Sequence, residues 1–113
     1  MIALKTFAKF ANIKLTDFNP KPTTKTPGQV EASDILWESD DGKTKIGIWE
    51  CSEGTFIADR TGAAEFCHIL SGKASITNYD GNGQRVMAGG DLLVLPKGWK
   101  GEWTIHELSL IHI

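Results

Sequence analysis

From residue 46 onward, short apolar segments alternate with glycine-rich breaks, and this pattern constrains the fold more than any other feature of the chain. The glycines supply the positive φ angles that tight turns need. Strand-like segments separated by a turn roughly every 8–12 residues are typical of a sandwich or barrel, not of a βαβ sheet. The expected strands span 46–51, 55–60, 65–70, 73–79, 84–88 and 92–96, with a further strand starting near Glu102 and 108–113 closing the chain.

The first 45 residues have a different character. Proline-containing breaks at 19–22 and 26–28 exclude a long helix and indicate an extended arm that runs over the barrel. Residues 3–13 have a weak helical pattern that suits a strand equally well, and both readings stay open. We expect an N-terminal arm over 1–45 and a barrel over 46–113, together one domain, since 113 residues is an ordinary single-domain length.

Two spaced motifs within the expected barrel narrow the fold. Gly90, Pro96 and Gly98 have the spacing G-x5-P-x-G, in which an apolar strand lies between two turns. Glu65 and Gly72 have the spacing E-x6-G. These motifs resemble the two halves of the cupin signature. They predict an all-β fold, a small cupin (double-stranded β-helix or jelly-roll) barrel with an extended N-terminal arm.

Residues 47–107 also resemble a narrower group, the small single-domain cupins similar to ureidoglycine aminohydrolase. The segments that carry this resemblance are WECSEG (49–54), EFCHILSG (65–72) and AGGDLLVLPKGWKGEW (88–103). The resemblance covers more than half of the chain and leaves the arm unassigned. Most members of this group have no assigned activity, so the resemblance implies a fold more than a function.

The resemblance also implies a metal site, and here the chain departs from the pattern. Cupins that bind metal present H-x-H, then a glutamate, then a histidine from the second motif. No corresponding position holds a histidine, and two carboxylates suit only weak binding of Mg²⁺ or Ca²⁺. We therefore expect no bound transition metal and no cofactor. The corresponding positions are Asp59 and Thr61, or Ala58 and Arg60 in the other hairpin register, followed by Glu65 and Gly101.

The histidines and cysteines of the chain are not expected to provide metal ligands or a reactive thiol. His68 follows Glu65 by three residues on one strand, so it should face outward where Glu65 faces inward. The other two histidines lie near the end of the chain, and packing at the surface or at an interface is the favoured interpretation for all three. Cys51 and Cys67 lie in apolar segments without an activating partner, which is typical of buried reduced thiols.

Glu65 is the most informative candidate for a binding site. A carboxylate that points into a narrow barrel is costly unless a cation, a hydrogen-bond donor or water meets it. Its neighbour is Asp59 or Arg60, depending on the register of the hairpin. Trp99 lies in the turn at the barrel mouth, and Trp103 should fill space on the inner face, as core first and as a pocket wall second. Glu65 is thus either a ligand-binding residue or a structural remnant.

These features leave three hypotheses for function. The first is a protein that binds a small polar metabolite in the barrel without a tightly held transition metal, through Glu65, Asp59, Arg60, Trp99 and Trp103. The second is a C–N hydrolase or lyase, as the resemblance to ureidoglycine aminohydrolase implies. The third is an interaction module whose barrel is only a scaffold. A thermal response to metabolites favours the first hypothesis, and tight metal binding favours the second.

The charge distribution and the hydropathy of the chain argue against nucleic acid and membranes as partners. Residues 1–30 carry a net charge of +4 and residues 31–113 carry −6, which argues against a barrel that binds nucleic acid. No apolar run approaches the roughly 18 residues of a transmembrane helix. The lysine-interrupted N-terminus has no secretory apolar region, so we expect a cytoplasmic protein without a membrane partner.

We predict that the protein is a homodimer in solution. An open barrel edge and an extended arm both favour pairing between two copies. Light scattering on the full chain at tens of micromolar should give twice the mass of 12.4 kDa calculated for one chain. A monomer mass at that concentration would contradict the prediction.

Overall fold

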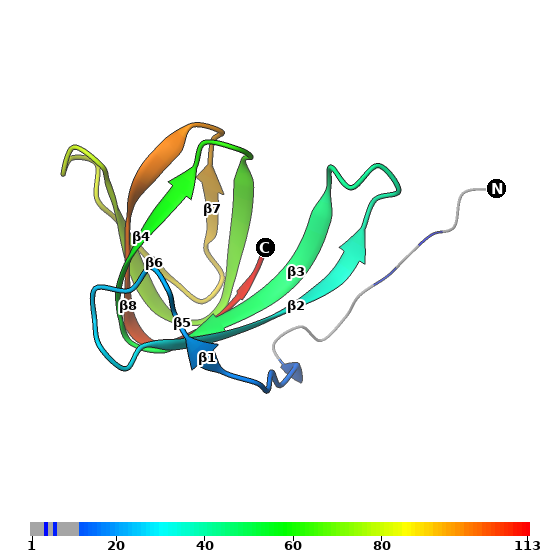
Figure 1. Ribbon diagram of the computed structural model, residues 1–113, viewed down its shortest axis with the longest axis horizontal. Coiled ribbons are helices and arrows are strands. Elements are labelled where there is room, and N and C mark those ends of the chain that lie inside the picture. Colours follow the sequence, from blue (N-terminus) through cyan, green and yellow to red (C-terminus); the bar gives the residue numbers. More distant parts are fainter. Residues whose placement is uncertain (1–3, 5, 7–11) are drawn as a thin grey trace.

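The computed structural model describes residues 4, 6 and 12–113 (Figure 1). Regular structure in these residues consists of strands, which confirms the all-β class. The strands are β1 (Asn19–Pro20), β2 (Val30–Glu38), β3 (Lys45–Cys51), β4 (Gly54–Arg60), β5 (Glu65–Asn78), β6 (Arg85–Ala88), β7 (Leu92–Leu95) and β8 (Trp99–His112). None of the described residues forms a helix long and apolar enough to cross a membrane.

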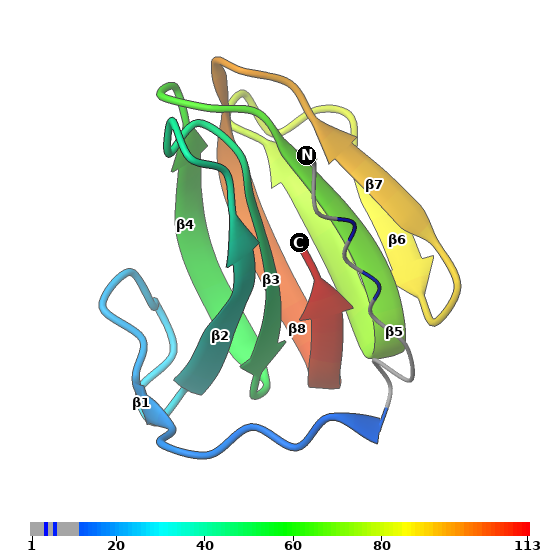
Figure 2. The same cartoon turned by 90° about the vertical axis from the view of Figure 1, so that its right-hand side faces the viewer.

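The strands form two layers joined by β5 and β8, which are antiparallel neighbours along most of their length. In one layer the order is β1-β2-β3-β8-β5-β7, and it uses the C-terminal half of β8. In the other layer the N-terminal half of β8 lies between β4 and β5, and β6 follows β5. Figure 2 shows β2, β3, β8 and β5 side by side. The arrangement is a jelly roll whose hydrogen bonding does not close into a continuous barrel.

The passage of β5 from one layer to the other depends on Gly72. The sequence pattern predicts a break between two strands at this glycine, but the structure has one strand of 14 residues with register shifts between Ile69 and Ala74. Gly72 has a φ of 95°, and a Cβ there would lie 2.6 Å from the carbonyl oxygen of Leu108. Only glycine accepts both conditions, so the chain bends here without leaving the sheet.

The segment expected to be an arm supplies a full strand of the sheet. β2 pairs with β3 from Glu31 opposite Cys51 to Glu38 opposite Lys45, and β1 adds a short pairing at the outer side of β2. The loop of residues 21–29 runs along β4, where Lys25 N–H donates to the carbonyl oxygen of Thr55 at 2.7 Å. Most of the segment 3–13, for which helix and strand remained open, lies outside the described residues.

The core lies between the two layers and follows the alternation of the strands. On β5, Cys67 and Ile69 point inward and are fully buried, whereas Phe66 is exposed on the outer face. His68 is on the same outer face as Phe66, as the strand periodicity predicts. Both cysteines are free and buried, as expected from the sequence. The core comprises Cys51, Phe56, Cys67, Ile69, Ala74, Ile76, Met87, Leu95, Trp103, Ile105 and Ile111.

We predict that Gly72→Ala destabilises the fold by about 2–5 kcal/mol, because left-handed backbone strain and overpacking add at this position. The added Cβ would lie 2.3 Å from the Ser109 hydroxyl oxygen and 2.6 Å from backbone of the neighbouring strand. The free energy of unfolding, measured by urea titration, tests this.

Two other glycines separate the two causes. Gly90 has a φ of 97° but open space around its Cβ position, so Gly90→Ala should cost only about 1–2 kcal/mol from backbone strain. Gly62 has neither constraint, and Gly62→Ala should change stability by less than about 0.5 kcal/mol. Equal effects at Gly72 and Gly90 would show that the close approach to β8 costs nothing.

Candidate functional site

A cavity of about 310 Å³ lies inside the jelly roll, between β2 and β3 on one side and β4, β5 and β8 on the other. Its volume is at the lower end of the range typical of pockets for small molecules. The cavity, called the barrel cavity below, is lined by Lys21, Ser33, Asp34, Ile35, Lys45, Gly47, Ile48, Trp49, Phe56, Ala58, Arg60, Glu65, Trp103 and Ile113.

The sequence left open which of two registers of a hairpin places its residues beside Glu65. In the structure β4 and β5 do not pair as a hairpin, since β8 lies between them, but one of the two alternating sets of β4 side chains faces the cavity. Ala58 and Arg60 line the barrel cavity, and Asp59 is exposed and does not. The Asp59 carboxylate accepts a hydrogen bond of 2.8 Å from the backbone N–H of Thr61. Hydrogen bonding to Thr61 lowers the pKa of Asp59. Of the two candidate neighbours of Glu65, the structure therefore brings Arg60 to it and leaves Asp59 outside.

Glu65 has a counter-ion in Arg60, at the turn between β4 and β5. The Arg60 Nη1 donates to Glu65 Oε2 at 2.9 Å, and the Cys67 thiol donates to Glu65 Oε1 at 3.2 Å. The side chain of Glu65 is 19% exposed and that of Arg60 is 38% exposed. An ion pair this accessible to water contributes only about 0.2–1 kcal/mol to stability. Both groups thus remain available to a molecule in the cavity.

Three rings form the apolar side of the cavity, called the aromatic wall below: Trp49, Phe56 and Trp103. The Trp49 ring meets the other two edge to face, with centroids 5.7 Å from Phe56 and 5.9 Å from Trp103. Phe56 and Trp103 are stacked at 6.1 Å. Trp103 is only 3% exposed and still lines the cavity, so it is both core and pocket wall.

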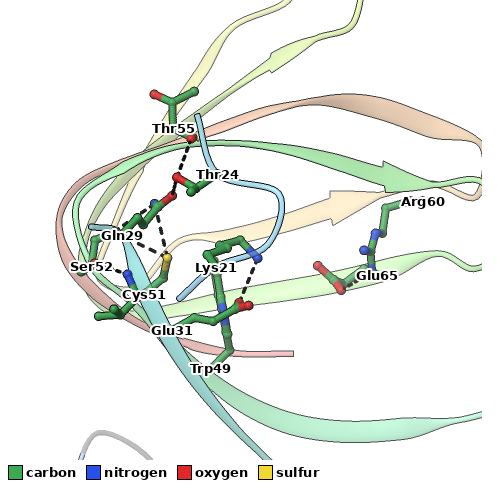
Figure 3. A network of polar contacts seen from close by, with 11 residues as sticks. Lys21, Thr24, Gln29, Glu31, Trp49, Cys51, Ser52, Thr55, Arg60 and Glu65 are labelled. Atoms are coloured by element: carbon green, nitrogen blue, oxygen red, sulfur yellow. Dashed lines mark hydrogen bonds and ion pairs between the residues drawn. The ribbon is translucent and has the colours of Figure 1, made fainter. Parts of the chain in front are cut away.

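A second charged group lies against the aromatic wall, and sequence reasoning missed it. The Lys21 ammonium is 2.9 Å from Glu31 Oε1, which also accepts a hydrogen bond of 2.8 Å from Trp49 Nε1. Figure 3 shows this pair and the Arg60–Glu65 pair in separate parts of the interior. The sequence feature that could have indicated Lys21 is its place between Pro20 and Pro22, because the two prolines restrict the backbone that carries this long side chain.

The Trp99 ring lies against Gly101, the position where a metal-binding cupin has its last histidine. A Cβ at Gly101 would lie 2.4 Å from a carbon of the Trp99 ring and 2.2 Å from the carbonyl oxygen of Thr77. The Trp99 indole N–H donates to Asn78 Oδ1 at 2.8 Å, which holds the ring over the glycine. Trp99 therefore packs against the core and does not line the barrel cavity.

The residues at the cupin metal positions do not fit a transition metal. In the observed register these positions are Ala58, Arg60, Glu65 and Gly101, and Glu65 already binds the guanidinium. Gly101 has no room for a ligand side chain. Over the described part of the chain, no three His, Cys, Asp or Glu side chains gather in a way that suits a metal ion.

The remaining histidines and the thiols lie in other environments. His68 and His112 are neighbours across β5 and β8 with ring centroids 6.5 Å apart, and His106 Nε2 is 2.9 Å from the Ser75 hydroxyl oxygen. Burial raises the pKa of Cys51 to about 12. Burial, and next the Glu65 carboxylate, raises the pKa of Cys67. Neither cysteine is a thiolate at neutral pH, which excludes the usual basis of a reactive cysteine.

A two-layered jelly roll with a largely apolar cavity and a few charged groups between its layers is the architecture of a cupin. Residues 38–110 match the EutQ-like cupin domain family. Because this match covers more than half of the chain, the protein belongs to that family. No curated protein matches the sequence.

Solved structures with the same fold come from several bacteria. The Clostridium difficile EutQ protein is 21% identical, with a TM-score of 0.74 over 92% of this chain and 80% of its own. A putative ethanolamine utilization protein Q from Salmonella typhimurium is 18% identical, with a TM-score of 0.68 over 84% and 74%. A DUF861 family protein from Thermotoga maritima is 35% identical over 57% of this chain and 72% of its own, with a TM-score of 0.54. These matches do not show the narrower ureidoglycine aminohydrolase-like group.

We predict that the purified protein contains far less than one equivalent of zinc, iron, manganese or nickel per chain. Arg60 neutralises Glu65, the one carboxylate at the metal positions, and imidazole donors are missing there. Elemental analysis tests this. A metal that binds the folded state raises the melting temperature, so added Zn²⁺ should leave the melting temperature of this protein unchanged. Close to one equivalent of metal per chain would contradict the prediction.

Proposed function

We propose that this cupin binds a small polar metabolite in the barrel cavity without a tightly held transition metal. The observation that carries the proposal is the combination of an accessible Arg60–Glu65 pair and the aromatic wall around one cavity. A few polar groups placed at one part of an apolar pocket are typical of sites for small molecules.

The Arg60–Glu65 pair offers both kinds of hydrogen bond to a ligand. Arg60 has five N–H donors, and the bond to Glu65 uses one of them. Each Glu65 oxygen accepts one bond, from Arg60 or from Cys67, and keeps a lone pair. The polar end of the ligand contacts this pair, and its apolar part lies against Trp103 and the rest of the aromatic wall. Trp99, the cross-strand partner of Arg60, does not line the cavity, so the proposed site leaves it out.

The two alternatives have less support. A C–N hydrolase similar to ureidoglycine aminohydrolase rests on the sequence resemblance and lacks ligand positions that fit a metal. A pure interaction module would not need an accessible ion pair beside a cavity. The homodimer and the cytoplasmic location that the sequence led us to expect remain parts of the proposal. Each is compatible with metabolite binding.

We predict that Glu65→Gln weakens binding of hydrogen-bond-donating metabolites by about 1–3 kcal/mol, the scale of a charged hydrogen bond. The amide keeps the shape of the carboxylate and can still accept from Arg60, so the melting temperature should change little. Ligands are first found by thermal shift on a panel of small polar metabolites. Titration of the wild type and the variant with each of them then gives the two dissociation constants.

Asp59→Asn is the matched control, because it also removes one carboxylate near this turn, but on the exposed side of β4. It should leave binding unchanged. If Glu65→Gln melts several degrees lower and still binds as the wild type does, Glu65 is a structural residue and the proposed site is wrong.

A further inference from the structure

The Lys21 ammonium fills a site that has the composition of an ammonium-binding site. Its Nζ lies 4.2 Å from the centroid of the Phe56 ring and 5.6 Å from that of Trp49. The Glu31 carboxylate completes the contact at 2.9 Å, and the lysine side chain is only 12% exposed. Aromatic faces with a carboxylate are what proteins use to bind organic cations. Here the cation belongs to the protein itself.

The backbone holds Lys21 in this position. The Lys21 N–H donates to the Gln29 carbonyl oxygen at 3.1 Å, and the prolines on either side restrict the chain. The Gln29 side chain is buried, accepts a hydrogen bond from the Thr24 hydroxyl and donates to the carbonyl oxygen of Ser52 at 3.1 Å. The loop of residues 21–29 is thus fastened to the jelly roll, and Lys21 is a fixed part of the cavity.

The two partners of the Lys21–Glu31 ion pair differ in their relation to the cavity. Lys21 lines the barrel cavity, whereas Glu31 does not. Among the charged side chains that line it, the cations are Lys21, Lys45 and Arg60, and the carboxylates are Asp34 and Glu65. A second ammonium entering the cavity would find the aromatic wall occupied and a positive charge already there.

We infer that Lys21 is a specificity-determining residue. It occupies the cation site on the aromatic wall, so the barrel cavity rejects ligands that would place an ammonium group there and accepts ligands whose group at this end is neutral or anionic. This inference rests on the proposed function and adds the chemical class of ligand at the end of the cavity next to the aromatic wall.

Lys21→Ala tests the inference, because it removes the internal cation and leaves the wall and Glu31 in place. The probe is n-butylammonium chloride, which has the charge of the deleted group and the length of the whole lysine side chain, including the β-carbon that alanine keeps. Its effect on the melting temperature is compared with those of n-butanol and of sodium chloride at equal ionic strength. We expect n-butylammonium to bind Lys21→Ala at least roughly tenfold more tightly than the wild type, as cation–π contacts and a charged hydrogen bond together imply.

Two control variants test whether the binding of the amine depends on the space left by Lys21 and on its position at the aromatic wall. Lys21→Met fills the same volume without a charge and should gain no binding of the amine. Lys45→Ala removes another cavity lysine, whose nearest carboxylate oxygen, on Glu38, is 4.0 Å away, and it should gain none either. If Lys21→Ala does not fold alone, its refolding yield with and without n-butylammonium gives the same answer.

Equal responses of Lys21→Ala to n-butanol and to n-butylammonium would overturn the inference, because the site would then recognise apolar volume only. So would a wild type that binds the amine as tightly as the variant. Neither outcome depends on Glu65, so failure here is distinguishable from failure of the proposed metabolite site, which Glu65→Gln tests.

Discussion

The pairing of β5 with β8 is the interaction on which the rest of the structure depends. Each strand has 14 residues and belongs to both layers, so every other strand except β1 and β2 pairs with one of the two. Such long strands must bend sharply between layers, and the bend requires the backbones to approach closely at Gly72. The position of the cavity follows from this, because the two layers separate on either side of the bend.

The same close packing decides what chemistry the cavity can support. At Gly101 the backbone of β8 lies against Thr77 of β5, and the Trp99 ring covers the inner side of the glycine. A histidine at this position would therefore require movement of backbone and not only a change of side chain. Arg60 takes the place of another metal ligand and neutralises Glu65. The backbone packing at Gly101 and this ion pair therefore both oppose a metal site of the usual cupin kind. The polar pair and the rings that remain are the basis of the proposed metabolite site.

The sequence predicted the parts of the structure that depend on local chemistry. Glycine-rich turns and alternating apolar residues placed β3, β4, β6 and β7 within a residue or two, because turn geometry and burial act over short distances. The continuous path of β5 through Gly72 was not predictable, since a glycine at a bend and a glycine at a turn look alike. Which side of β4 faces Glu65 was not predictable either, because it depends on the pairing of β4 with β8 in place of the expected hairpin with β5. Lys21 was missed because its partners, Glu31 and Phe56, are distant in the sequence.

The Arg60–Glu65 and Lys21–Glu31 ion pairs come from different parts of the chain. Arg60 and Glu65 lie within residues 38–110, the part that matches the EutQ-like cupin domain, as does the whole aromatic wall. Lys21 and Glu31 lie before it, on the loop and strand that the N-terminal segment adds to the jelly roll. The family domain therefore provides the polar pair and the rings, and the preceding segment sets the charge presented at the aromatic wall. If the cavity binds a metabolite as proposed, a change in the N-terminal segment can alter its ligand preference while the packing of β5 against β8 stays the same.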